Sequence, residues 1–166
     1  MATMRMLGLK EYEEMLSKLD KDTVPMIGRA LYEGGRIVAD EFHREVEALP
    51  VVPPNVQGTE ERKLTGITSE QKRGLLQGLG IAKMRSRDGV HDIKIGFDGY
   101  NSVHTKKYPG GQPNAMIARS INTGSSFRVA THFADRAARN SKARAEKAMQ
   151  IQFDKDLEKI YSIKHP

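Results

Sequence analysis

Hydrophobic positions recur at helical spacing near the N-terminus of the chain. An apolar start at Met4, Met6 and Leu7 favours a strand, and Leu9, Tyr12, Leu16 and Leu19 then follow three or four residues apart. This spacing predicts a short amphipathic helix. Asp20 and Asp22-Thr23 offer N-cap oxygens just before Pro25, a residue suited to the first turn of a helix. We therefore expect a second helix to begin there.

The second helix is predicted to run to Pro50, because its apolar positions keep to one broad stripe. These positions are Ile27, Leu31, Ile37, Val38, Phe42, Val46 and Leu49. Gly34-Gly35 interrupts the stripe, and glycine is a poor helix former. The pair either marks a bend, lets another element approach closely, or is a tolerated weak spot.

The segment from Pro50 to Gly66 is rich in proline and glycine and has little periodicity. This composition predicts an exposed loop or an extended arm. An arm of this kind often becomes ordered against a partner. Val52, Pro53 and Pro54 are therefore candidate contact residues, with a merely flexible loop as the alternative.

The middle of the chain carries a strong hairpin signal. Thr68-Ser69-Glu70-Gln71 resembles a helix start, and the helix should end near Gly78 or Gly80. The stretches 81–87 and 91–97 each alternate apolar and polar residues around Asp88-Gly89. Both turn residues tolerate positive φ, so a type I′ hairpin is predicted.

Beyond the hairpin, residues 98–113 are rich in glycine and proline and predict a long connection at the edge of the sheet, with Tyr108 as a candidate contact. Residues 115–121 predict a strand or a short helical turn. A long amphipathic helix then runs from Phe133 to about Tyr161, with Asn140-Ser141 as a possible irregularity. The order predicts one α+β domain over residues 1–166, in which a small antiparallel sheet packs against N-terminal helices and a long C-terminal helix.

Composition narrows the function. The 166 residues include no cysteine, which excludes disulfides, zinc ribbons and thiol catalysis. No apolar stretch approaches the length of a membrane span, so we expect synthesis in the cytoplasm and no membrane partner. The formal net charge of +6 suits nucleic acid or acidic protein surfaces, although basic surfaces also serve solubility.

Catalytic and metal-binding patterns do not emerge from the sequence. The five histidines are scattered, the glycine pairs lack the residues of a phosphate loop, and no serine or lysine nucleophile motif is present. Acidic runs near Glu13 and at Asp154, Asp156 and Glu158 are expected to form solvated helix faces. We expect no enzyme, no metal and no cofactor.

Basic residues concentrate in the first half of the last helix, whereas acidic residues occupy its second half. This order opposes the helix macrodipole, which favours acids at the N-terminal end. The charge can pair with a neighbouring subunit, face DNA, or simply be solvated. The candidate residues are Arg136, Arg139, Lys142, Arg144 and Lys147.

Several short motifs resemble the head-tail joining family (neck or tail-completion proteins) of long-tailed bacteriophages and prophages. They are the stretches 7–12, 37–41, Leu75-Leu76, 93–97 and 118–126. The last is similar to the family's A-x-x-x-E-x-G-T-S turn, with Asn122 where an acidic residue is common. His132-Phe133 stands where the family usually carries a proline-phenylalanine pair, and 134–137 where it often has L-R-P-A.

The resemblance implies a structural subunit that assembles with copies of itself into a ring, with a hexamer as the expected copy number, at the head-proximal end of the tail. Its partners would be connector or stopper proteins and tail-tube or tail-terminator proteins, with passive contact to DNA in the channel. Its place would be the virion tail at the head-tail junction. The alternative from the residues alone is a small basic nucleic-acid-binding protein that uses the last helix, and a regulatory partner protein is a third possibility.

Overall fold

The computed structural model describes residues 9–162, with side chains placed from residue 21 to residue 160 and at residue 162. The expected strand at Met4–Leu7 and the side chains of the N-terminal apolar stripe lie outside these described residues. The elements are α1 (Leu9–Glu47), α2 (Ser69–Gly78), β1 (Leu79–Ile81), β2 (Arg85–Arg87), β3 (Val90–Asp92), β4 (Ile95–Phe97), α3 (Asn114–Thr123) and α4 (Phe133–Ser162). The predicted α+β class is confirmed.

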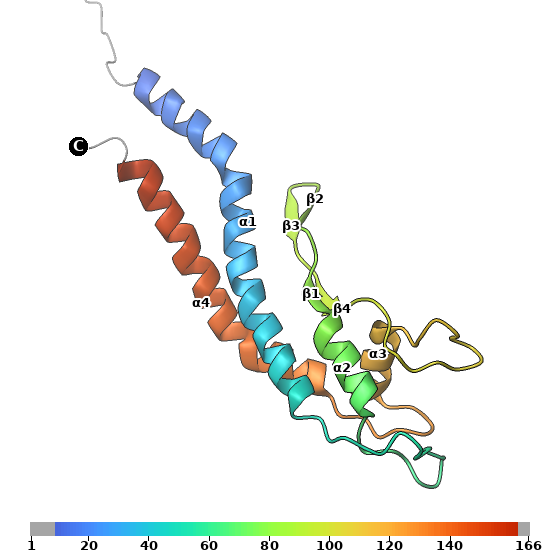
Figure 1. Cartoon of the computed structure of the whole chain (residues 1–166). Coiled ribbons are helices and arrows are strands. Elements are labelled where there is room, and N and C mark those ends of the chain that lie inside the picture. Colours follow the sequence, from blue (N-terminus) through green and yellow to red (C-terminus); the bar gives the residue numbers. More distant parts are fainter. Residues whose placement is uncertain (1–8, 163–166) are drawn as a thin grey trace, which may run out of the picture.

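The N-terminal part of the chain forms one helix, so the prediction of two helices was wrong. Pro25 lies inside α1, where it removes a backbone hydrogen bond and costs about 3 kcal/mol or more. The helix changes direction in its N-terminal half (Figure 1), as expected where a proline interrupts the hydrogen-bond ladder. The capping signals at Asp20 and Asp22 therefore lie within a continuous helix.

Helix α1 packs between α4 on one side and the β-strands on the other (Figure 1). The two long helices are antiparallel. The glycine pair permits both contacts, because a Cβ at Gly34 would lie 2.6 Å from Cγ of Met149, and one at Gly35 would lie 2.5 Å from Cδ1 of Ile93. Of the three interpretations of this pair, close approach of other elements is therefore confirmed.

The strands form one long hairpin whose two halves are out of register. β1 pairs with β4 through Ile81 and Ile95, and β2 pairs with β3 through Arg85 and Asp92. Residues 82–84 thus lie opposite residues 93–94, so the first strand carries one extra residue, as in a β-bulge. Asp88 and Gly89 have φ values of 53° and 77°, which confirms the predicted hairpin turn.

The two short helices on the far side of the hairpin surround part of the core. α2 begins with the predicted capping box, in which Thr68 and Gln71 exchange hydrogen bonds. Residues 115–121 are helical rather than extended, within α3. α4 is unbroken at Asn140-Ser141, where the hydroxyl of the buried Ser141 donates to the carbonyl oxygen of Ala137 within the helix.

An aromatic cluster joins three elements at the centre of the molecule. The rings of Phe42, Phe97 and Phe133, from α1, β4 and α4, have centroids 5.9–6.3 Å apart. Phe133 is fully buried and belongs to a wider apolar cluster of Val46, Leu49, Ile67, Leu75, Ile117, Ala118 and Ile121. This cluster fixes the lower ends of α1 and α4 against α2 and α3, and leaves the upper parts of the two long helices as a projecting pair (Figure 1).

Candidate interaction surfaces

Ion pairs line the contact between α1 and α4. Arg136 binds Glu45 with nitrogen-oxygen distances of 2.7 and 3.1 Å, and Arg144 binds Glu41 at 2.6 Å. Nearer the N-terminal end of α1 the polarity reverses, since Arg29 donates to Asp156 at 2.7 Å. In this antiparallel pair, the basic first half of α4 therefore meets carboxylates in the C-terminal half of α1, and the second half of α4 meets Arg29.

Two of these carboxylates are buried, and both are held ionised. Burial alone would raise the pKa of Glu41, but hydrogen bonds from Arg144 and Arg44 outweigh it and lower that pKa. For Asp156, the hydrogen bond from Arg29 lowers the pKa against the opposing effect of burial, with further help from Gln152. Because a buried carboxylate needs its partners, these contacts specify how α1 and α4 align.

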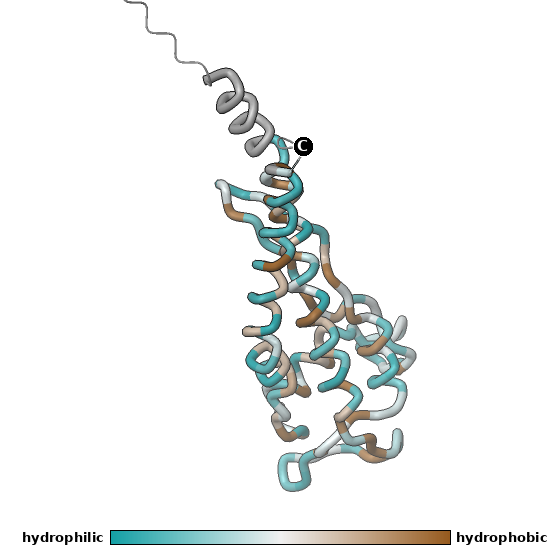
Figure 2. The backbone as a smooth tube through the Cα atoms, turned by 90° about the vertical axis from the view of Figure 1, so that its left-hand side faces the viewer, coloured by the Kyte–Doolittle hydropathy of each residue, from teal (hydrophilic) through white to brown (hydrophobic). Residues whose placement is uncertain are grey.

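The candidate basic residues of α4 therefore divide into two groups. Arg136 and Arg144 pair within the chain, a use of the charge that the sequence reasoning did not consider. Arg139, Lys142 and Lys147 are exposed, and Lys142 lies 4.0 Å from Glu146 on the same helix. Hydrophilic residues predominate along α4 (Figure 2).

The acidic half of α4 departs from the prediction of a solvated face. Asp154 and Glu158 are exposed, but Asp156 is buried against α1. An acidic residue that pairs across two helices cannot be told from a solvated one by spacing on its own helix alone.

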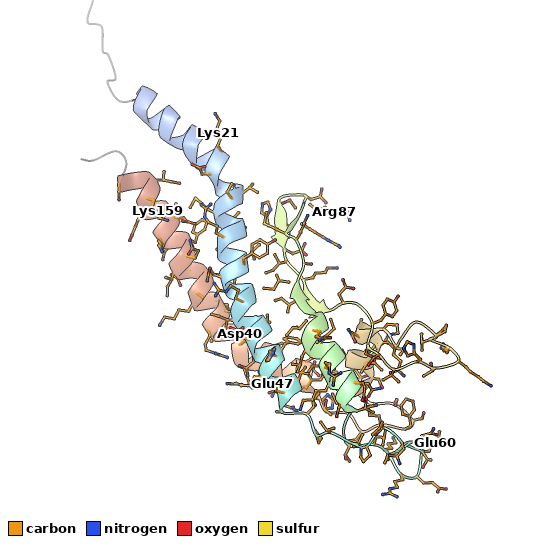
Figure 3. All side chains as sticks on the ribbon, viewed as in Figure 1. Lys21, Asp40, Glu47, Glu60, Arg87 and Lys159 are labelled. Atoms are coloured by element: carbon orange, nitrogen blue, oxygen red, sulfur yellow. The ribbon has the colours of Figure 1, made fainter. Side chains whose placement is uncertain are left out.

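The arm at residues 50–66 is attached to the body at both ends. The amide of Val52 donates to the carbonyl oxygen of Ile67 at 2.9 Å, and Leu64 exchanges backbone hydrogen bonds with Phe127 and Val129. Glu60 lies at the tip of the arm (Figure 3). Of the candidate contacts, Pro53 and Pro54 are exposed, whereas Val52 is half-buried beside Gly66.

Exposed apolar side chains occur on the arm and on the turn after α3, two segments that are joined by backbone hydrogen bonds. We call this set the arm patch, and it is formed by Val51, Val56, Phe127 and Val129, which are 41–51% exposed. Leu64 connects the two segments by its backbone hydrogen bonds, and Gly58 packs against the carbonyl oxygen of Phe127. Apolar groups left in water at one end of a molecule mark a surface that another molecule can cover.

A buried polar cluster behind the arm was missed by the sequence reasoning. Arg128 is 94% buried, and its guanidinium donates to the carbonyl oxygen of Gly66 and lies 3.5 Å from Oε1 of Gln71. Desolvation lowers the pKa of Arg128. The amide of Gln71 in turn donates to Oε1 of Gln112 at 3.0 Å. The cluster joins the arm, α2 and the connection that follows β4.

Asn122 connects the turn after α3 to α4. Its Oδ1 accepts a hydrogen bond from the amide of Ala134 at 2.9 Å, and its Nδ2 donates to Asp135. The side chain thus satisfies a free amide in the first turn of α4, the role that a capping residue performs. α4 begins at Phe133, as the sequence predicted.

Within residues 21–160, no three histidine, aspartate or glutamate side chains are grouped as metal ligands would be. Over the same part of the chain, no helix has both the length and the apolar character needed to cross a membrane. The hollow over the exposed face of β1 and β4 is shallow and lined by Gly80, Gly96 and Ala115. These surfaces suit contact with other molecules.

Comparison with known proteins does not place the chain in a family. No protein-family model, curated protein or solved structure matches it.

Proposed function

We propose that this chain is a structural subunit of a phage or prophage tail, and that its copies form a ring at the head-tail junction. The arm patch is the observation that carries the proposal. Single exposed apolar side chains are ordinary on a protein surface, but several on two segments joined by backbone hydrogen bonds mark a candidate interaction surface. The resemblance of the sequence motifs to head-tail joining proteins supports the same assignment.

A ring requires that two different surfaces of the same chain meet, so that each copy binds the next in a head-to-tail manner. The arm patch supplies one such surface, and the exposed Pro53 and Pro54 extend it. In this proposal the subunit is not an enzyme. Connector or stopper proteins contact the ring on one side and tail-tube or tail-terminator proteins on the other, and DNA passes through its channel.

The alternative, a small nucleic-acid-binding protein that uses α4, has less support. Arg136 and Arg144 donate to carboxylates of α1, so two of its five cations have their charge offset within the chain. Asp135 and Glu146 also lie on the exposed part of this helix half.

Deletion of the gene from the phage or prophage that encodes it tests the proposal. We expect electron microscopy to show filled heads and separate tails, and a plasmid copy of the wild-type gene should restore tailed particles. Particles with normally attached tails after the deletion would show that the proposal is wrong. The neighbouring genes should encode portal and tail-tube proteins.

The double variant Phe127→Gln with Val129→Gln tests the arm patch in the same assay. Removing two apolar anchors from an interface should weaken the contact about tenfold or more, so this variant should restore few tailed particles. Ile151→Gln is the matched control, because Ile151 is a large apolar residue of α4 that is 58% exposed. If both variants restored tailed particles equally well, the arm patch would not be part of the interface.

A further inference from the structure

The connection from β4 to α3 lies in a long acid-free stretch of the sequence. Between Asp98 and Asp135 there is no aspartate or glutamate, whereas Lys106, Lys107, Arg119 and Arg128 are basic. The connection projects away from α1 and α4 (Figure 1). Its outer part therefore carries positive charge with no acidic residue near it in sequence.

A closed turn forms the tip of this connection. The amide of Thr105 donates to the carbonyl oxygen of Tyr108 at 3.1 Å, and the amide of Tyr108 donates to the carbonyl oxygen of Thr105 at 3.0 Å. Lys106 and Lys107 occupy the two central positions and are exposed. The Nζ atom of Lys107 lies 5.5 Å from the centre of the Tyr108 ring, within the range of a cation–π contact. We call these four residues the lysine turn.

The base of the connection is fixed to the body by buried polar groups. Oδ1 of the buried Asn101 accepts hydrogen bonds from the amides of Val103 and Gln112, and Gln112 also binds Gln71 of α2. Gly111 has a φ of +103°, and a Cβ there would lie 2.1 Å from the carbonyl oxygen of Asn101. Only glycine fits this position. The lysine turn is therefore presented by an ordered stem, which lowers the entropy lost on binding.

The lysines differ from the cations of α4 in how their charge is used. Among the ion pairs of the described residues, none includes Lys106 or Lys107. The aromatic side chain of the lysine turn, Tyr108, is half-buried and has the Nζ atom of Lys107 over its ring. Proteins contact DNA phosphates mainly through lysine and arginine side chains, and these contacts do not depend on base sequence. Two adjacent lysines on an ordered turn suit a contact of this kind.

We propose that the lysine turn contacts the phosphate backbone of duplex DNA. This inference rests on the proposed function, because a ring at the head-tail junction brings DNA past each copy. It assigns the DNA-facing surface to the connection between β4 and α3 rather than to α4. The contact is electrostatic and independent of base sequence.

Binding of the full-length protein to a short, fluorescently labelled duplex, followed by anisotropy at several salt concentrations, tests this inference. Lys106→Gln with Lys107→Gln should weaken binding about tenfold at low salt and reduce the slope of log affinity against log salt by about 2. Arg139→Gln with Lys142→Gln is the matched control, since it also removes two exposed charges. The control should change affinity by less than about twofold.

Three results would overturn the inference: no salt-dependent binding by the wild type, no loss in the lysine-turn variant, or an equal loss in the α4 control. A peptide rich in glutamate that binds the wild type as tightly as the duplex would assign the turn to an acidic protein surface instead. The gene-deletion assay separates this test from the proposed function. If the wild-type gene restores tails but its product does not bind duplex DNA, the inference about the turn alone fails.

Discussion

The basic half of α4 and the lysine turn have similar charge in the sequence but opposite roles in the structure. On α4, Arg136 and Arg144 face carboxylates of α1 at less than 3 Å. On the turn, Lys106 and Lys107 extend from an ordered stem with no acidic residue between Asp98 and Asp135. A run of positive charge in a sequence is therefore not a binding surface until the carboxylates that approach it in space are known.

The α4 pairs also account for the charge order that opposes the macrodipole. Acids at the N-terminal end of a helix contribute a few tenths of a kcal/mol when they are exposed. A buried carboxylate that loses its partner costs about 3 kcal/mol or more. Alignment of α1 and α4 through Glu41 and Asp156 thus outweighs the unfavourable position of the charges along α4.

Forcing the two long helices apart should have the largest effect on stability. Gly34→Leu places a side chain where even a Cβ would lie 2.6 Å from Met149 and 3.2 Å from the carbonyl oxygen of Ala145. We expect a loss of about 3 kcal/mol in the free energy of unfolding, measured with urea, since the whole α1–α4 contact must shift. Gly80→Leu is the control, because no atom lies within 4 Å of a Cβ there, and it should cost less than about 1 kcal/mol.

Reversing one paired charge should have the next largest effect. Arg144→Glu would place a second carboxylate beside the buried Glu41 and remove one of its two arginine donors, leaving Arg44. We expect a loss of about 2 kcal/mol, less than for a fully buried pair because Arg144 itself is half-exposed. The same change at the exposed Arg139 should alter the urea midpoint little. If both variants were equally stable, the pairing would not contribute to the alignment of α1 and α4.

Acid should weaken the α1–α4 contact through the same carboxylates. Because the pKa of Glu41 lies below its ordinary value of 4.5 in the folded chain, its stabilisation is complete above about pH 4.5 and is lost as pH falls through the folded-state pKa. Asp156 behaves in the same sense, below its ordinary value of 3.8. We expect the urea midpoint to decrease as the pH drops below about 4.5. In the Glu41→Gln variant this decrease should be less steep.

The control for acid is Glu60→Gln, which removes an exposed carboxylate at the tip of the arm (Figure 3). This variant should keep the acid dependence of the wild type. If the Glu41→Gln variant lost stability as steeply as the wild type when the pH falls, other groups would control the acid dependence.

Local signals in the sequence predicted the elements better than the contacts between them. The capping box at Thr68, the turn at Asp88-Gly89 and the start of α4 at Phe133 depend on neighbours within a few residues, and all were predicted correctly. Pro25 was assigned to the start of a helix because a proline inside a helix is disfavoured by local energetics alone.

The residues that were missed depend on partners far away in the sequence. Glu41 meets Arg144 across 103 positions, and Arg128 meets Gly66 across 62. Spacing along one helix cannot reveal such pairs, so the charged face of α4 was predicted as available for a neighbour or for DNA.

The smallest expected effect is the most informative for the comparison between the two basic regions. Lys106→Gln with Lys107→Gln removes two charges from a turn whose backbone hydrogen bonds and stem contacts do not involve either lysine side chain. Exposed substitutions away from such contacts change stability by about 0.5 kcal/mol or less, so the urea midpoint should stay near that of the wild type.

Arg136→Gln with Arg144→Gln removes the same charge from α4 and should lower the midpoint, because Glu41 would remain buried without its interhelical donor. Equal midpoints for the two double variants would mean that the charges of α4 are no more committed to the fold than those of the turn, and α4 would again be a candidate to face DNA.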